Sequence, residues 1–293
     1  MSHSLQSDTP NTPPGAETFP ASWLAYLRAN VFLYRLLPEE DQECLRRRLP
    51  RFIAAKFWEG CAGQRITDEV RVTIAAHACL LLLGLDENYD FDHCKTILVY
   101  PGGYLQVGED SLGNAINAGH MLGEAHHQGP VVLSWWHACW EGRHHGRGNV
   151  VLHEFAHKLA EKDDHHGGMP PLCDPCDVRR WESVFADEYE QLVEDAERQR
   201  PTLLDPYGAH DSAEFFAVAT ECFFLQPRPM RRRHPRLYEL LAEGYGQDPA
   251  EWRSDEATAE LTRQAEEQYL RHAVNECDMA LRRDPRYLAA LWD

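Results

Sequence analysis

The sequence predicts a protein of mixed helix and strand content in which helices predominate. Long segments carry apolar residues at three-to-four spacing, and two short segments are rich in β-branched and aromatic residues and border Gly-Pro turns. The 293 residues allow one large domain or a core with appendages. We expect a disordered tail over residues 1–20, a main domain over residues 21–250 and a helical extension over residues 251–293.

The first segments are expected to be helical after a polar, proline-rich start that resembles no secretory signal. Residues 21–60 show short helical patterns that are expected to break at Pro38 and Pro50. Thr67 is expected to cap a helix that continues to about Gly84. His77, within that helix, is expected to be a core or surface histidine.

Two strands and three later helices follow. Residues 95–100 and 131–136 predict strands. Helical patterns cover residues 181–198, 212–225 and 235–244. Ten of the sixteen histidines lie between His120 and His166, but adjacent pairs cannot face one point on a regular element, so most are expected in loops.

Composition excludes several classes of partner. The formal net charge of −18 disfavours nucleic acid. The longest apolar run is shorter than the ~20 residues that a membrane-spanning helix needs. Nine scattered cysteines suit reduced thiols, and the Cys173-x-x-Cys176 pair lacks the second pair of a structural zinc site. We therefore expect a cytoplasmic protein with neither a membrane nor a direct nucleic-acid partner.

The segment GNVVLHEFAHKLA predicts a metal site. On a helix, His153 and His157 share one face, so both rings can direct a nitrogen at one zinc ion per chain. Glu154 then lies beside the metal, where it can take a proton from a water molecule. The alternative is an ordinary amphipathic helix that happens to carry two histidines.

The third protein ligand is not obvious. Glu161 continues the same row, but three ligands in a line cannot surround a metal. Asp163 has the spacing of a ligand that follows a glycine turn, but Ala160 occupies the position of that glycine. A ligand from a separate helix remains.

Residues 212–225 supply two candidates for that ligand. This segment is apolar nearly all round, which predicts a buried helix, and its only charged residues are Glu214 and Glu221. A buried carboxylate needs a partner such as a zinc ion. With Asp211 as the helix cap, Glu214 also fits a capping box. Spacing alone leaves Glu214, Glu221 or neither as the ligand.

Five motifs in order resemble the Mlc titration factor A family of bacterial zinc metallopeptidases: ITDEVRVTIAAHACLLLLGL, ILVYPGGY, GPVVLSW, VVLHEFAHKL and AEFFAVATECFF. The resemblance extends from about Leu37 to about Pro249. It implies an α+β fold with a zincin-like core, similar in its catalytic half to the anthrax lethal factor protease domain, and a gluzincin-like site.

The resemblance also implies roles for individual residues. His153, His157 and Glu214 would be the zinc ligands and Glu154 the general base. Glu221 would orient a ligand histidine.

Two further positions depend on the same resemblance. Tyr207 matches a catalytic tyrosine seven residues before the glutamate ligand, and its phenol would stabilise an oxyanion. Ala160 departs from the family, which usually has aspartate there, so Asp163 or Asp164 is expected to substitute for it.

The resemblance implies aminopeptidase-like hydrolysis of short peptides. In zincins the peptide substrate adds as a strand to a sheet edge, and VVLSW is the expected edge. A second function is the sequestration of a transcriptional repressor similar to Mlc, with peptidase activity secondary. A purely structural zinc is disfavoured, because structural sites usually have four thiolate-rich ligands.

Overall fold

The computed structural model describes residues 19–87, 89–109, 115–121, 123–125, 129–144, 146, 148–161, 178–252, 257–264 and 267. Of the expected N-terminal tail, only residues 19 and 20 are among the described residues. Of the expected C-terminal extension, residues 257–264 are described and are helical. Asp163, Asp164, Cys173 and Cys176 also lie outside. Within these ranges, no helix combines the length and apolar character needed to cross a membrane.

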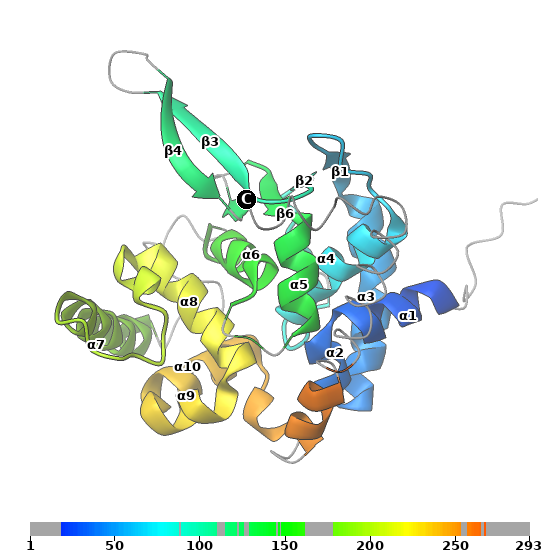
Figure 1. Cartoon of the computed structure of the whole chain (residues 1–293). Helices are drawn as coiled ribbons and strands as arrows, with labels where there is room; N and C mark the ends of the chain where they lie inside the picture. Colours follow the sequence, from blue (N-terminus) through cyan, green and yellow to red (C-terminus); the bar gives the residue numbers. More distant parts are fainter. Residues whose placement is uncertain are drawn as a thin grey trace, which may run out of the picture.

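Helices make up most of the described residues, and a small sheet lies at one end of the molecule (Figure 1). The helices are α1 (Ala21–Asn30), α2 (Phe32–Leu36), α3 (Glu39–Ala55), α4 (Asp68–Leu80), α5 (Trp135–Arg143), α6 (Val150–Glu161), α7 (Val178–Glu197), α8 (Ser212–Leu225), α9 (Pro227–Arg233) and α10 (Pro235–Tyr245), with 3₁₀ turns η1 (Pro206–Ala209) and η2 (Pro249–Glu251). The strands are β1 (Phe57–Gly60), β2 (Thr96–Tyr100), β3 (Tyr104–Glu109), β4 (Ala115–Met121), β5 (Gly123–Ala125) and β6 (Val131–Ser134). A helix-dominated fold with a small sheet is compatible with the expected α+β class.

The main sheet has the strand order β1-β2-β6-β5. Strands β1, β2 and β6 run parallel, with Ile97 opposite Val131, and β5 pairs antiparallel with β6. The expectation that VVLSW forms the edge of the sheet is therefore wrong. The part of it that forms β6 lies between β2 and β5, and β5 is the outer strand. Val131, Val132 and Leu133 are all buried, as expected of a strand that is covered on both faces of the sheet.

A separate antiparallel hairpin, β3–β4, projects from the end of the sheet (Figure 1). The sequence did not predict it. Residues 135–136, expected to end the second strand, begin α5 instead, because the Ser134 hydroxyl accepts the backbone N–H of His137 and caps the helix.

The expected break at Pro50 is also wrong, since Pro50 lies inside α3. A helix-interior proline costs about 3 kcal/mol through a lost hydrogen bond and a steric clash. Buried Leu49 and Phe52 anchor the helix on either side of the proline, and the Arg48 guanidinium donates to backbone carbonyls in residues 85–89. Tertiary packing therefore keeps the helix continuous.

The cap predicted at Thr67 is confirmed, because its hydroxyl accepts the backbone N–H of Val70. The helix ends at Leu80, and Gly84 lies in the turn that follows. A Cβ atom on Gly84 would lie 2.1 Å from the carbonyl oxygen of Tyr245. Only glycine allows the C-terminus of α10 to approach this turn so closely.

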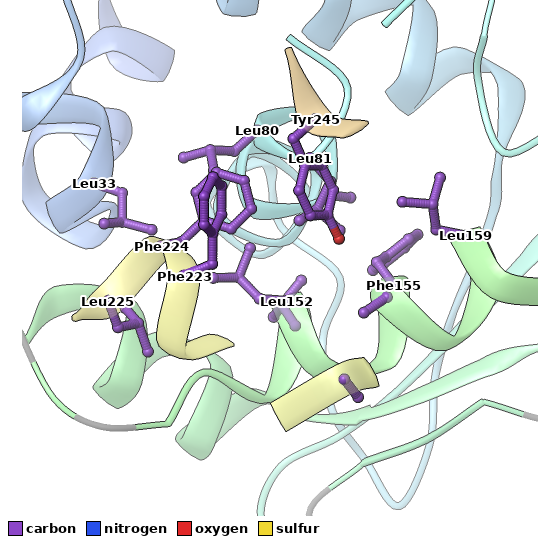
Figure 2. Close-up of a cluster of buried hydrophobic side chains, with 14 of the residues drawn as sticks. Leu33, Leu80, Leu81, Leu152, Phe155, Leu159, Phe223, Phe224, Leu225 and Tyr245 are labelled. Atoms are coloured by element: carbon purple, nitrogen blue, oxygen red, sulfur yellow. The ribbon is translucent and has the colours of Figure 1, made fainter. Parts of the chain in front are cut away.

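The core joins helices distant in sequence (Figure 2). Its centre includes Leu80 and Leu81 at the end of α4, and Tyr245 in α10. Leu152, Phe155 and Leu159 of α6 face the same cluster, as do Phe223, Phe224 and Leu225 of α8. These side chains are at most 2% exposed. None of the six cysteines among the described residues forms a disulfide: Cys44, Cys61, Cys79, Cys94, Cys139 and Cys222.

Candidate metal site

Helix α6 carries the two histidines, and three side chains satisfy the backbone N–H groups of its first turn. The side-chain oxygen of Asn149 accepts from Leu152 N at 3.0 Å. Carboxylates from two other helices accept the neighbouring groups: Glu221 accepts from Asn149 N at 2.5 Å, and Glu141 accepts from Val150 N at 2.6 Å. These acceptors fix the start of the helix and so the positions of its side chains.

Two of the predicted ligands share one face of α6, and the third comes from α8. His153 Nε2 lies 3.2 Å from His157 Nε2 and 3.0 Å from Glu214 Oε2. His157 Nε2 lies 3.5 Å from the same carboxylate oxygen. Within the described residues, His153, His157 and Glu214 form a group that could hold one metal ion, with ligand atoms within 4.8 Å of one another.

Both glutamates of α8 reach His153, but on opposite sides of its ring. Glu214 approaches Nε2, whereas Glu221 Oε1 lies 2.7 Å from Nδ1. A histidine that binds a metal through Nε2 donates its other N–H to such an acceptor. The two alternatives that spacing left open thus occupy different places, with Glu214 among the converging ligand atoms and Glu221 behind the ring.

The contacts of Asp211, Glu214 and Glu161 bear on the other roles that the sequence suggested for the two glutamates. Asp211 caps α8 by accepting the backbone N–H groups of Ala213 and Glu214, as predicted. The Glu214 side chain, which a capping box would direct back to the helix start, instead contacts the two histidines. Glu161 accepts from the buried Lys158 ammonium at 2.8 Å.

Burial and charge act strongly on this group. Burial alone would lower the pKa of His153, but hydrogen bonds with Glu214 and Glu221 outweigh it and raise the pKa to about 10. Burial opposes ionisation of Glu214 too, yet the two histidines bring its pKa well below the usual value. Burial raises the pKa of Glu141 to about 7, and the Glu221 charge acts in the same direction. The site therefore concentrates negative charge around two imidazoles.

Glu154 lies next to the outer strand of the main sheet. It is 5% exposed. A Cβ atom on Gly123 of β5 would lie 2.5 Å from Glu154 Oε1 and 2.6 Å from Val150 Cγ2. The absence of a side chain at residue 123 thus lets the strand backbone approach this carboxylate.

Tyr207, on η1, completes the predicted set. Its hydroxyl lies 3.5 Å from Glu214 Oε1, and its side chain remains 54% exposed. Burial of the hydroxyl raises the pKa of Tyr207, and the charges of Glu214 and Glu154 add to the effect. The phenol therefore keeps its proton and remains a hydrogen-bond donor at neutral pH.

Sequence reasoning found every member of this cluster but missed three neighbours. Asn149 and Glu141 support the start of α6, and Gly123 admits the outer strand. Asn149 could have been found, because asparagine is favoured directly before a helix. No signal in the sequence connects Glu141 or Gly123 with α6, since tertiary packing alone brings them there.

A small mixed sheet, a helix with two histidines flanking a glutamate, and a carboxylate from a second helix are features of the metallopeptidase class. Residues 11–246 match the family of glucose-regulated metallo-peptidases M90. The chain belongs to this family, and its similarity to Mlc titration factor A proteins confirms the resemblance seen in the sequence.

Three relatives show the extent of the similarity. An uncharacterized protein of Synechocystis sp. is 36% identical over 242 residues, which are 78% of this chain and 85% of that protein. Mlc titration factor A of Klebsiella pneumoniae (strain 342) is 31% identical over 228 residues, 74% and 83% of the two chains. The Mlc titration factor A of Pectobacterium atrosepticum is 29% identical over 245 residues, 82% and 90% of the two chains.

Proposed function

We propose that this protein is a zinc-dependent peptidase with aminopeptidase-like activity on short peptides. The observation that carries the proposal is the convergence of His153, His157 and Glu214, from two helices, with Glu154 on the same helix as the histidines. Membership in a metallopeptidase family supports it.

The donor set of this cluster fits zinc. Two imidazole nitrogens and one carboxylate oxygen are the ligands of many catalytic zinc sites, which keep the remaining position for water or substrate. A bound zinc ion supplies a Lewis acid that lowers the pKa of a water molecule toward neutrality and polarises the scissile carbonyl. Glu221 would hold the His153 ring in the tautomer that presents Nε2 to the metal.

The protein's own groups would then move the protons and stabilise the charge. Glu154 accepts the proton of the attacking water and later delivers it to the leaving amine. The phenol of Tyr207 donates a hydrogen bond to the oxyanion that develops on the carbonyl oxygen. Because Tyr207 is 54% exposed, a peptide can reach it from solvent.

The peptide would bind along β5. Among the described strands β5 pairs only with β6, so its other edge can accept an added strand. Gly123 lies on this strand next to Glu154, which would bring the peptide backbone close to the general base. The acidic surplus of the chain favours a substrate with a terminal ammonium group.

A second candidate function is the binding of a transcriptional repressor. Several relatives carry the name Mlc titration factor A, which indicates that those proteins titrate Mlc. A comparable repressor would be the partner here. Binding that persists in a Glu154→Gln variant would separate this role from peptide hydrolysis.

The decisive experiment measures bound zinc and hydrolysis of aminoacyl and peptidyl substrates in the wild type and in Glu154→Gln. We expect one zinc ion per chain in both proteins and activity only in the wild type. Equal activity in both would refute the mechanism. Glu214→Gln should lower the zinc content. If Glu214→Gln retained full zinc while Glu221→Gln lost it, Glu221 and not Glu214 would be the third ligand.

A further inference from the structure

A pocket of about 210 Å³ adjoins the candidate metal site, between the segment 202–207 and α8. His153 and Tyr207 are among its lining residues, so the pocket borders one proposed metal ligand and one proposed catalytic group. The mechanism proposed above assigns no role to this space. Its position beside the reacting groups suits the side chain of a substrate residue.

The walls of the pocket combine apolar and polar side chains. Leu203 and Leu204 contribute from the loop, and Val218 and Cys222 contribute from α8. The two α8 residues are four positions apart and therefore share one helix face. All four are at most 8% exposed, so packing on their far sides holds them in place.

Three polar side chains that line the pocket already have partners in the protein. Glu221 binds His153 Nδ1 and Asn149 N, and Asp205 accepts the backbone N–H of Tyr207 at 2.9 Å. The hydroxyl of Thr202 donates to the Leu204 carbonyl at 2.7 Å. The described residues that line the pocket include no lysine or arginine. His153, the basic side chain among them, already contacts Glu221 and Glu214, so an acidic substrate side chain would find no free counter-charge among these residues.

We propose that this pocket receives a substrate side chain adjacent to the scissile bond and selects a medium-sized apolar one, such as that of Leu, Met or Phe. The inference rests on the proposed peptidase function and specifies its substrate class. A cavity of ~150 Å³ lined by apolar side chains holds a benzene ring, so this pocket has room for an isobutyl or benzyl group. Alanine would leave most of it unfilled.

The test changes the size of the pocket at Leu203, which lies on the loop before η1 and is not one of the proposed ligands or catalytic groups. Leu203→Phe narrows the pocket and Leu203→Ala widens it. The substrates are tripeptides of alanine with one Leu, Phe, Glu or Lys at each position in turn. For the wild type we expect kcat/KM to be about 10- to 100-fold higher with Leu than with Ala at one position, which is the range that apolar pockets provide.

The two variants should shift this selectivity in opposite directions. Leu203→Phe should bring the Leu-to-Ala ratio close to one, and Leu203→Ala should shift the preference toward Phe. Leu36→Ala is a matched control, because Leu36 on α2 is buried to a similar extent but does not line the pocket. The Leu-to-Ala ratio of kcat/KM for this variant should equal that of the wild type. Zinc content and thermal unfolding of each variant show whether the site is intact.

A binding measurement separates this inference from the peptidase function. Calorimetry with the same tripeptides and zinc-loaded Glu154→Gln protein reports side-chain preference without turnover. If no peptide is hydrolysed but Leu peptides bind more tightly than Ala peptides, the peptidase function fails and the pocket assignment stands. Hydrolysis without a Leu or Phe preference, a preference for Lys or Glu, or a preference unaffected by both Leu203 variants would overturn the pocket assignment.

Discussion

Glu221 joins the ring of His153 to the start of the helix that carries it. One carboxylate oxygen lies 2.7 Å from His153 Nδ1, and the other accepts the backbone N–H of Asn149. Glu221 is 9% exposed and lies on α8, the helix that also carries Glu214. A single side chain thus sets both the direction of a proposed ligand and the position of its helix.

Replacing Glu221 should weaken metal binding. Glu221→Gln removes the negative charge behind the ring and one of its two acceptors, and changes of this kind reduce metal affinity about 10- to 100-fold. Competition with a chromophoric chelator measures the affinity. Glu239→Gln, a change at an exposed position on α10, is the control. An affinity equal to that of the wild type would show that Glu221 does not orient His153.

Replacing Tyr207 should slow turnover without loss of metal. Tyr207→Phe removes only the hydroxyl, and the loss of one oxyanion donor lowers kcat by about 10²- to 10³-fold. Because the side chain is 54% exposed, folding should be unaffected. Steady-state kinetics with zinc analysis give the result, and Tyr26→Phe on α1 is the control. A rise in KM with kcat unchanged would assign Tyr207 to substrate binding instead.

A methyl group at residue 123 should displace the general base. In Gly123→Ala the new carbon would lie 2.5 Å from Glu154 Oε1, so the carboxylate must move. Because a shift of about 1 Å in a catalytic group can cost ~10²-fold, we expect a comparable fall in kcat/KM with zinc retained. Gly102→Ala is the control, since a Cβ atom there meets nothing within 4 Å. Full activity in Gly123→Ala would contradict the arrangement.

Buried His77 should make stability depend on pH. It is fully buried, and burial lowers its pKa from 6.5 to about 4 although Nδ1 lies 2.9 Å from the Thr73 carbonyl. Between pH 6.5 and about 4 the unfolded chain binds a proton that the folded protein does not. The free energy of unfolding should therefore fall as the pH decreases through this window, by about 3 kcal/mol in total, and should not respond to this group above it.

The measurement compares wild type with His77→Leu by urea denaturation from pH 7 to pH 4.5, with a chelator present to remove metal. The difference between the two proteins isolates the contribution of residue 77, because other titrating groups are common to both. Parallel stability profiles would show that His77 becomes protonated in the folded state without penalty.

The site was more predictable than the sheet that borders it. Two histidines four residues apart need only helical geometry to converge. In α8, Glu214 and Glu221 are the only charged residues of an apolar segment, which makes them candidates for a buried metal site. Spacing alone could not rank Glu214 and Glu221, because both reach the same ring. Their separation into Nε2 and Nδ1 contacts depends on how α6 and α8 cross, which tertiary packing sets.

Strands β3, β4 and β5 were missed for a different reason. Their segments contain Gly, Asn and Ala, which are depleted in strands, and pairing with a neighbour supplies what propensity does not. Strand β4 also carries His120, and the histidine-rich composition of this region favoured a loop interpretation. Because β5 was not predicted, the edge of the sheet was expected at β6, one strand inside the observed edge. Pro50 was misjudged similarly, since contacts made by Arg48 and Phe52 outweigh the local penalty.

The apolar seam between α6 and α8 shown in Figure 2 has a thermodynamic consequence for the metal. In small zinc-folded modules, ion binding must supply the free energy that orders the chain. Here Phe155 and Phe223 are buried between the two helices. The free energy of this packing offsets the entropy that is lost when the chain between His157 and Glu214 is closed. The binding free energy is then not consumed by folding. We therefore expect chelation to yield a folded protein that regains zinc in a simple one-site reaction.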